Sequence, residues 1–372
     1  MITELPPELD PSSWLSLAHL ASESDVRRAL SASVPTEADF AALVSPAAEG
    51  LLEEMAQRAK RLTETHFGRT ISLYAPLYLS DFCPGGCAYC GFAADRNQPR
   101  RCLNRDEMLC EFAALKAMGF EEVLLLTGER SPQADFPYLR DSVAAAASHF
   151  AAVTVEAFPM TLVEYRELAA AGCVGVTLYQ ETYDPVQYDV LHRWGPKRDF
   201  ANRLEAPSRV LEAGIRTVGL GALLGISDPM LDTLALYRHA RALRRKYWQS
   251  GITISFPRVC PQEGGYQPPF PVDERFLARI IFAFRICMPD VPLNMSTREN
   301  AGFRDGIAGV GISKMSIASR TTVGGYGEPT TSPDGQFQIN DDRDIETFFA
   351  ALRSKGLEPV FKNWDRVYNL DQ

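Results

Sequence analysis

"EVLLLTGERSPQADFPYLRDSVAAAASHFAAVTVEA", residues 122–157, contains two short apolar runs separated by a stretch of helix-forming residues. The runs, 122–127 and 152–157, have the length of buried strands, and the second is rich in β-branched residues. A strand, a helix and another strand in this order predict a right-handed βαβ unit with parallel strands.

The same alternation continues on both sides of this stretch. Further strands are predicted at 71–79, 174–180, 216–221, 252–256, 291–296 and 312–317, and helical stretches follow them, for example at 105–118, 161–171, 229–246 and 272–287. Eight such units predict an α/β fold, a closed (β/α)8 barrel of the TIM type. Residues 1–68 lack strand patterning, so we expect an N-terminal helical extension at 1–68 and a barrel with a C-terminal tail at 69–372.

Composition narrows the classes of partner. The 372 residues are 46% hydrophobic and carry a net charge of −9, with no run of lysine or arginine that would follow a phosphate backbone. We therefore expect no nucleic-acid partner. No apolar stretch approaches the roughly 20 residues of a membrane span, and the acidic, proline-rich N-terminus does not resemble a secretion signal. A cytoplasmic protein without a membrane partner is expected, in which cysteines are free thiols, metal ligands or redox groups.

Three cysteines lie within eight positions after the first predicted strand, in "YLSDFCPGGCAYCGFAAD" (78–95). Cys83, Cys87 and Cys90 are the densest group of thiols in the chain, and soft thiolates suit zinc or iron–sulfur sites. Such sites usually take four ligands, so the fourth must come from elsewhere. One interpretation is a zinc site completed by Cys102 or His66. The remaining cysteines are scattered and are expected to be structural.

Polar residues gather where the predicted strands end, which is the catalytic face of a parallel barrel. Each group also has a simpler explanation. Thr127-Gly128-Glu129 is also compatible with an ordinary strand exit, and Arg298 with a helix cap or an ion pair to Glu299. The residues concerned are Thr127, Gly128, Glu129, Glu156, Glu181, Ser296, Arg298, Ser316, Ser319 and Arg320.

The spacing Cys-x3-Cys-x2-Cys, with Tyr89 before the last cysteine, resembles the signature of the radical S-adenosylmethionine (SAM) superfamily. The resemblance implies that Cys83, Cys87 and Cys90 bind three irons of one [4Fe–4S] cluster. SAM would chelate the fourth, open iron and be reduced to methionine and a 5′-deoxyadenosyl radical. The missing fourth ligand would then be the cosubstrate.

Longer stretches are similar to the tyrosine lyase family of thiamine thiazole biosynthesis. They cover essentially residues 68–365 and include 179–228, "ISFPRVCPQEGGYQPPFPV" (254–272), "STRENAGFRDG" (296–306), "GYGEPTTSPDGQFQINDDRD" (325–344) and "PVFKNWD" (359–365). The resemblance implies cleavage of the Cα–Cβ bond of L-tyrosine to 2-iminoacetate (dehydroglycine) and p-cresol, while SAM yields 5′-deoxyadenosine and methionine.

Carried over to this chain, the resemblance assigns roles to individual residues. Thr127, Gly128 and Glu129 would meet the SAM amino group, Glu181 the ribose and Arg203 the methionine carboxylate. Arg298, beside Ser296, would hold the carboxylate of tyrosine, with Arg304 and Arg320 as alternatives. Implied protein partners are thiazole synthase and a flavodoxin- or ferredoxin-type reductant. The loops 181–199 and 257–271 would either dock the synthase or close over SAM.

Three alternatives remain. A related hydrogenase maturase also cleaves tyrosine but needs a second cluster on C-terminal cysteines, and this chain has no cysteine after Cys287. A tryptophan lyase is the second, because Ser316-Ile317-Ala318-Ser319 departs from the usual Ser-Ala-Gly-Ser and adds bulk near the expected substrate pocket. A non-catalytic metal-binding module is the third.

Overall fold

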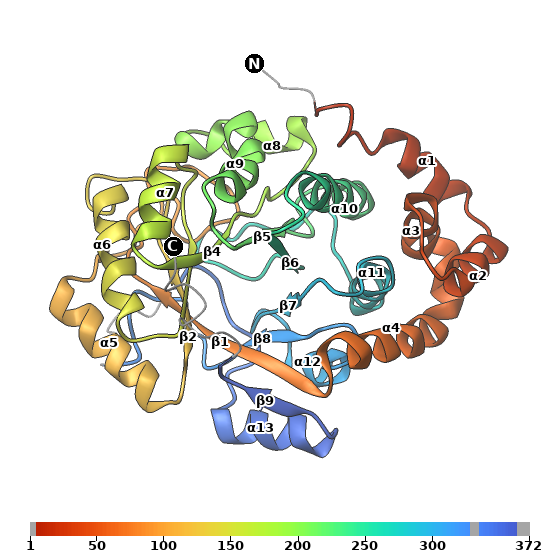
Figure 1. Cartoon of the computed structure of the whole chain (residues 1–372). Helices are drawn as coiled ribbons and strands as arrows, with labels where there is room; N and C mark the ends of the chain where they lie inside the picture. Colours follow the sequence, from red (N-terminus) through yellow and green to blue (C-terminus); the bar gives the residue numbers. More distant parts are fainter. Residues whose placement is uncertain (1–4, 328–334, 363–372) are drawn as a thin grey trace.

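The computed structural model describes residues 5–327 and 335–362. Its centre is a closed barrel of eight parallel strands, in the order β2-β3-β4-β5-β6-β7-β8-β1, with β1 also paired to β2 (Figure 1). The strands are β1 (Thr70–Tyr78), β2 (Glu122–Leu126), β3 (Ala152–Glu156), β4 (Cys173–Thr177), β5 (Thr217–Gly221), β6 (Gly251–Ser255), β7 (Leu293–Met295) and β8 (Lys314–Ser316). The predicted barrel is confirmed, although β7 and β8 are shorter than their apolar runs.

Helices surround this barrel. They are α5 (Arg105–Ala117), α6 (Phe136–Ala147), α7 (Leu162–Ala170), α8 (Pro185–Leu191), α9 (Phe200–Glu212), α10 (Pro229–Lys246), α11 (Glu274–Cys287) and α12 (Ala301–Ile307), with a short 3-10 helix η2 (Pro196–Arg198) before α9. Most begin at an Asp, Asn or Thr whose side chain accepts a backbone N–H, as Asn104 does at α5 and Thr161 at α7. Such caps fix where each helix starts.

The N-terminal extension consists of α1 (Ser12–Leu20), α2 (Glu23–Ser31), α3 (Glu37–Val44), the 3-10 helix η1 (Pro46–Leu51) and α4 (Leu52–Phe67). It lies against the outside of α10 and α11 (Figure 1). Phe40 of α3 is fully buried there, stacked on Tyr237 with ring centroids 3.7 Å apart and edge-on to Phe284 at 5.0 Å. The extension therefore shares one hydrophobic core with the barrel, while the division at residues 68/69 stays a prediction.

A ninth strand, β9 (Glu358–Val360), follows α13 (Ile345–Ser354) and pairs in parallel with the start of β1. β2 begins to pair with β1 only further along that strand. β9 therefore covers the part of the β1 edge that β2 leaves open. β9 was not predicted, because it has only three residues and one of them is a proline. None of the described helices combines the length and apolar character needed to cross a bilayer.

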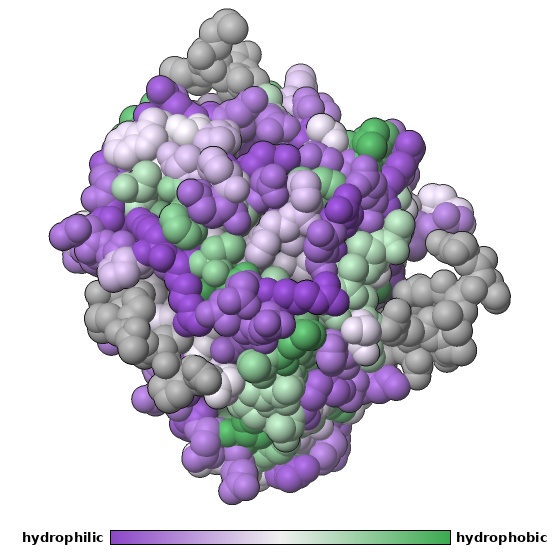
Figure 2. All heavy atoms as spheres, turned by 90° about the vertical axis from the view of Figure 1, so that its left-hand side faces the viewer, coloured by the Kyte–Doolittle hydropathy of each residue, from purple (hydrophilic) through white to green (hydrophobic). Residues whose placement is uncertain are grey.

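The face formed by the outer surfaces of α5 to α7 is mostly hydrophilic, with only scattered apolar spots (Figure 2). The two faces of the strands differ: Val123 and Leu125 of β2 lie in the hydrophobic core, whereas Glu122 of β2, Thr154 of β3 and Lys314 of β8 line a cavity inside the barrel. Near the N-terminal end of the barrel, Lys314 of β8 forms an ion pair with Glu122 of β2. A cavity lined by Phe67, Thr217 and Lys314 also lies at this end, but the predicted site residues follow the C-terminal ends of the strands, so the site is sought at the other end.

Candidate active site

Cys83, Cys87 and Cys90 lie in the loop that follows β1, at the C-terminal end of the barrel. A Cβ placed on Gly85 would be 3.5 Å from the sulfur of Cys83 and 3.8 Å from that of Cys87, so both sulfurs lie beside this glycine. Burial raises the pKa of the Cys83 and Cys87 thiols, and the charges of the neighbouring thiols raise these values further. Cys83 and Cys87 are therefore brought together, whereas no three Cys, His, Asp or Glu side chains of the described residues are arranged to hold a metal ion, so a site formed by all three cysteines stays a prediction.

Glycines let other segments approach this cysteine loop closely. The backbone of Gly86 donates to the carbonyl of Trp194, and a Cβ on Gly86 would lie 2.3 Å from the Trp194 ring. A Cβ on Gly128 would lie 2.6 Å from the carbonyl oxygen of Phe82 and 2.8 Å from the Cβ of Cys83. Gly128 thus touches the cysteine loop directly, which gives a packing reason for the predicted glycine.

The zinc interpretation finds no support in the positions of its two candidate ligands. His66 lies at the end of α4, before β1 begins, whereas the cysteines follow the end of β1. A nine-residue strand spans about 30 Å. Cys102 is half-buried, and its thiol donates to the carbonyl of Gln133.

Glu129, Glu181, Lys197 and Arg203 form a buried ion network next to the cysteines. Arg203 donates to a Glu129 carboxylate oxygen at 3.0 Å and to the carbonyl of Tyr179 at 2.7 Å, and Lys197 donates to Glu181 at 2.6 Å. Arg203 also lies 3.9 Å from Glu181. Two cations balance two carboxylates, so the network is neutral without a ligand.

One oxygen of this network is free to accept a ligand. Glu129 Oε2 is buried and has no hydrogen-bond partner among the described residues. A buried acceptor without a partner is costly, and an amino group is the kind of donor that it suits. Thr127 lies beside Glu129, with its hydroxyl directed to the carbonyl of Gly128 at 3.1 Å. Glu181 is held at a φ of +70°, unusual for a residue with a side chain.

Two cavities open at this end of the barrel. The first lies next to Cys90 and is lined by the side chains of Glu181 and Lys197. The second lies inside the barrel and is lined by polar and aromatic side chains, among them Tyr74, Ser255, Asn294, Ser296, Ser316 and Ser319. They share one wall, formed by Glu156, Tyr179, Pro257, Arg298, Gln336 and Phe337.

This layout matches a cofactor beside a substrate. The first cavity is lined by the thiol of Cys90, the carboxylates of Glu156 and Glu181 and the ammonium group of Lys197. A thiol suits one corner of an iron–sulfur cluster, and charges of both signs suit a zwitterionic cosubstrate. The second cavity lies inside the barrel, where a small molecule would be surrounded by polar and aromatic side chains. A group bound in the first cavity would face a molecule bound in the second across the shared wall.

Arg298 is the arginine that points into both cavities. Its guanidinium lies 3.4 Å from the ring centroid of Phe337 and donates to the carbonyl of Arg258 at 3.3 Å. The ion pair to Glu299 weighed from the sequence does not form, because Glu299 pairs with Arg258. Ser296 lies two residues before Arg298, and its hydroxyl accepts the Arg298 backbone N–H at 3.4 Å.

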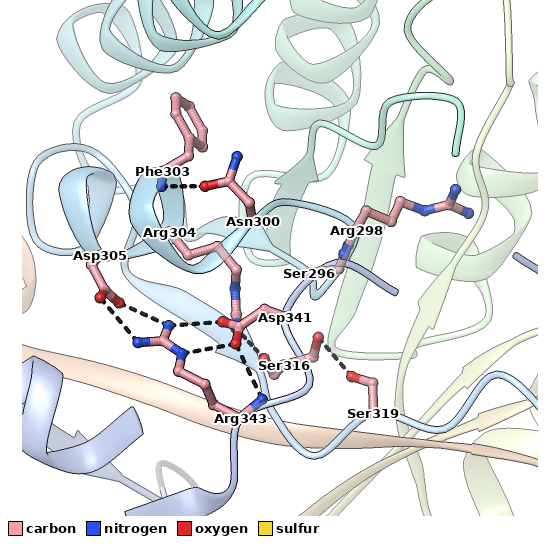
Figure 3. Close-up of polar contacts among 10 residues, drawn as sticks. All are labelled: Ser296, Arg298, Asn300, Phe303, Arg304, Asp305, Ser316, Ser319, Asp341 and Arg343. Atoms are coloured by element: carbon pink, nitrogen blue, oxygen red, sulfur yellow. Dashed lines mark hydrogen bonds and ion pairs between the residues drawn. The ribbon is translucent and has the colours of Figure 1, made fainter. Parts of the chain in front are cut away.

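Of the two alternative arginines, Arg304 is engaged in other contacts (Figure 3). Arg304 is 1% exposed and forms an ion pair with Asp341 while donating to the carbonyl of Ser316. Asp341 is also bound by Arg343, so Arg304 belongs to a structural cluster from which Arg298 points away (Figure 3). Arg320 is exposed. The structure thus favours Arg298 among the three candidates.

The unusual sequence Ser316-Ile317-Ala318-Ser319 at strand eight does not narrow the barrel cavity. Ser316 and Ser319 line it, with their hydroxyls 3.2 Å apart, but Ile317 is 2% exposed and packs in the hydrophobic core. Ala318 lies between them at a φ of +50°, where the family pattern has glycine. The prediction that this sequence adds bulk near the substrate pocket was therefore wrong, because the Ile317 side chain points into the core.

Sequence reasoning missed two parts of the site. Glu156 at the end of β3 was noticed but received no role, although it lines both cavities. The segment 335–341 lies over the cavities: Gln336 accepts hydrogen bonds from Gly91 N–H and the Tyr78 hydroxyl, and Thr321 donates to the carbonyl of Phe337. Its contacts join residues about 250 positions apart, which no local pattern reveals.

The loop 257–271 lies against the cysteine loop. Tyr266 packs on a small apolar cluster of Leu191, Leu223 and Ile226, together with Ala88 and Tyr89 of the cysteine loop. Phe270, by contrast, is 39% exposed. Tyr266 thus packs beside Tyr89 and Leu223, which line the first cavity, whereas Phe270 faces solvent.

Comparison with known proteins identifies the family of the chain. The Radical SAM superfamily pattern matches residues 77–237, and the Biotin and Thiamin Synthesis associated domain matches residues 255–358. The chain is 44% identical to the 2-iminoacetate synthase of Escherichia coli (strain K12) over 92% of this chain and 91% of that protein. The corresponding figures for the 2-iminoacetate synthase of Salmonella typhimurium are 41%, 92% and 91%.

Among solved structures, the chain is similar to HydG, a maturase of the [FeFe]-hydrogenase. The TM-score is 0.88 at 30% identity, over 96% of this chain and 80% of that one. The two proteins therefore share their overall fold, but the sequence identity of this chain to the synthases is higher. The chain belongs to the 2-iminoacetate synthase family of the radical SAM superfamily.

Proposed function

We propose that the chain is a lyase that cleaves the Cα–Cβ bond of L-tyrosine to 2-iminoacetate and p-cresol, consuming SAM, for the thiazole moiety of thiamine diphosphate. The observation that supports this most is the shared wall between the two cavities, because it would set an amino acid directly against the cofactor. Tyrosine loses a hydrogen atom, its side chain leaves as a 4-hydroxybenzyl fragment, and the uptake of one electron and one proton completes p-cresol.

Cys83, Cys87 and Cys90 would hold a single [4Fe–4S] cluster with one open iron. The cluster and SAM together supply the hydrogen-abstracting radical when bound. Glu129 would accept the SAM amino group through its free oxygen, and Glu181 would bind ribose hydroxyls. Arg203 holds Glu129 and Tyr179 in place, and from there it would attract the methionine carboxylate.

Arg298 would grip the substrate carboxylate with its planar, bidentate guanidinium. Stacking on Phe337 fixes the plane of that group, so little side-chain entropy is lost on binding. Ser296 supports the Arg298 backbone and lines the same cavity. The segment 335–341 excludes water above the substrate, which protects a radical from side reactions.

Two protein partners follow from the same chemistry. A flavodoxin- or ferredoxin-type protein would supply the electron. Thiazole synthase would take the product, because an imine of glyoxylate hydrolyses readily in water. The exposed Phe270 is the docking contact that we assign to the synthase, while Tyr266 packs beside residues that line the first cavity. Co-purification with thiazole synthase should be lost in Phe270→Ala and kept in Tyr266→Ala.

Anaerobic turnover with tyrosine, SAM and a reductant tests the proposal. We expect p-cresol, 5′-deoxyadenosine and methionine in equal amounts, with glyoxylate from hydrolysed 2-iminoacetate. Cys87→Ala should lose cluster iron and all products, whereas the matched variant Cys110→Ala, at an exposed thiol on α5, should keep both. Consumption of tryptophan in preference to tyrosine would refute the proposal and favour the tryptophan lyase.

A further inference from the structure

Two side chains of opposite charge face the shared wall of the cavities without pairing with each other. Glu156 ends β3 and Arg298 follows β7, and these strands are four apart in the ring of eight, so the two groups approach from opposite sides of the barrel. Within 5–327 and 335–362, neither forms an ion pair within 4.0 Å. Each charge is thus available to a ligand between them.

An α-amino acid complements this arrangement. Its carboxylate and its ammonium group are attached to the same carbon, so a carboxylate held by Arg298 brings the ammonium to the same wall. A buried ammonium needs an anionic or neutral acceptor, because leaving it unpaired is costly. Glu181 also lines that region, but it already pairs with Lys197 and lies 3.9 Å from Arg203. Of the two carboxylates that line the first cavity, Glu156 is therefore the one without an ion-pair partner among the described residues.

We propose that Glu156 binds the α-ammonium group of the amino-acid substrate and accepts one proton from it. The proton moves from nitrogen to a carboxylate oxygen, which leaves a neutral amine and a carboxylic acid with no change in total charge. A neutral amine is the form that can become the C=N group of the imine product. The inference rests on the proposed function for the identity of the product.

The surroundings of Glu156 suit this exchange. Burial, followed by the charge of Glu181, raises the pKa of the Glu156 carboxyl to about 7, against the opposing charges of Arg298, Lys197 and Arg203. Burial raises the pKa of the hydroxyls of Tyr74, Tyr78 and Tyr179, which line the barrel cavity with Glu156, so they stay neutral. The first cavity adds the thiol of Cys90, and it adds Tyr89 and Cys260, whose pKa values are also raised by burial. Near neutral pH the carboxyl can therefore hold or release a proton.

The assignment also orients the substrate. With the α-carbon at the shared wall, the aromatic ring extends into the barrel cavity toward Ser255 and Asn294. The amino group then lies on the side of the cofactor cavity, and the phenol lies away from it. A hydrogen atom on the amine would be the one nearest to the cofactor.

Ligand binding to the cluster-reconstituted enzyme with SAM, without reductant, tests the inference. Equilibrium dialysis compares tyrosine with 3-(4-hydroxyphenyl)propionate, which lacks only the amino group. We expect Glu156→Gln to weaken tyrosine binding on the order of 10- to 100-fold, as for a lost charge-assisted hydrogen bond, and to leave the analogue within about twofold. Glu122→Gln, at the opposite end of the barrel, should change neither.

Three results would overturn the assignment. Equal losses for tyrosine and the analogue would mean that Glu156 does not face the ammonium, and a loss confined to SAM affinity would place Glu156 at the cofactor. The third needs no variant: wild-type affinity for tyrosine should fall below about pH 7, as the carboxylate is protonated, while the affinity for the analogue is flat. A flat profile for both would contradict the proposal. Failure of the wild type to make p-cresol would instead refute the proposed function.

Discussion

Replacing Gly128 with alanine should damage the cysteine loop although no ligand residue changes. The new Cβ would lie 2.6 Å from the carbonyl oxygen of Phe82 and 2.8 Å from the Cβ of Cys83. Real Cβ atoms essentially never come this close to other heavy atoms, so the backbone of the cysteine loop must move to relieve the two contacts. The loop would shift by roughly 0.5 Å or more, and overpacking of this kind costs about 1–3 kcal/mol.

Iron and sulfide content after reconstitution, together with thermal unfolding of the apoprotein, measures the effect. We expect a lower melting temperature and less than the wild-type four irons per chain, because Cys83 is displaced from its position beside Cys87. The matched control is Gly306→Ala in α12, where a Cβ meets nothing within 4 Å and alanine favours the helix by about 0.5–1 kcal/mol. Wild-type iron content and stability in Gly128→Ala would refute the packing argument.

Three further predictions use other parts of the molecule. Arg298→Lys keeps the positive charge but loses the planar guanidinium and its stacking on Phe337. Tyrosine turnover should therefore fall on the order of 100-fold, while SAM cleavage that is uncoupled from tyrosine persists. Small and equal effects on both reactions would mean that another residue binds the substrate carboxylate. Ala318→Gly should raise the free energy of unfolding by about 0.5–1 kcal/mol in urea titration, because glycine adopts a φ of +50° without strain; a loss would contradict this. Burial lowers the pKa of His239 to about 4, so below about pH 6.5 the histidine is protonated in the unfolded chain but not in the folded one. The free energy of unfolding should therefore drop by up to ~1.4 kcal/mol per pH unit down to pH 4. His239→Asn should show a shallower pH dependence, and an unchanged one would reject His239 as its source.

The barrel could be predicted from sequence because its information is local. Each apolar run was short, each helix was capped, and eight repeats of the same unit leave few topologies. The cysteine ligands were equally accessible, since Cys83, Cys87 and Cys90 are near neighbours in the chain. Strand ends also located Glu129, Glu181 and Arg298 correctly at one end of the barrel.

What escaped prediction depends on contacts between distant residues. The pairing of Glu129 with Arg203, the close approach of Trp194 to Gly86 and the cover formed by 335–341 leave no periodic trace in the sequence. Ile317 was misplaced for a related reason: its neighbours Ser316 and Ser319 line the cavity, but the turn at Ala318 directs Ile317 into the core. Side-chain direction at such a turn is set by backbone conformation rather than by residue type.

The ion network and the barrel cavity draw on the chain in different ways. Glu129, Glu181, Lys197 and Arg203 all come from before residue 204. The barrel cavity, by contrast, combines Glu156 and Tyr179 from before residue 204 with Ser296, Arg298, Ser316 and Phe337 from after residue 254. Helix α10 lies between these two parts of the sequence. Recombination within α10 would therefore keep the ion network intact but would join two halves of one substrate cavity, so Glu156 and Tyr179 would have to suit each new C-terminal half.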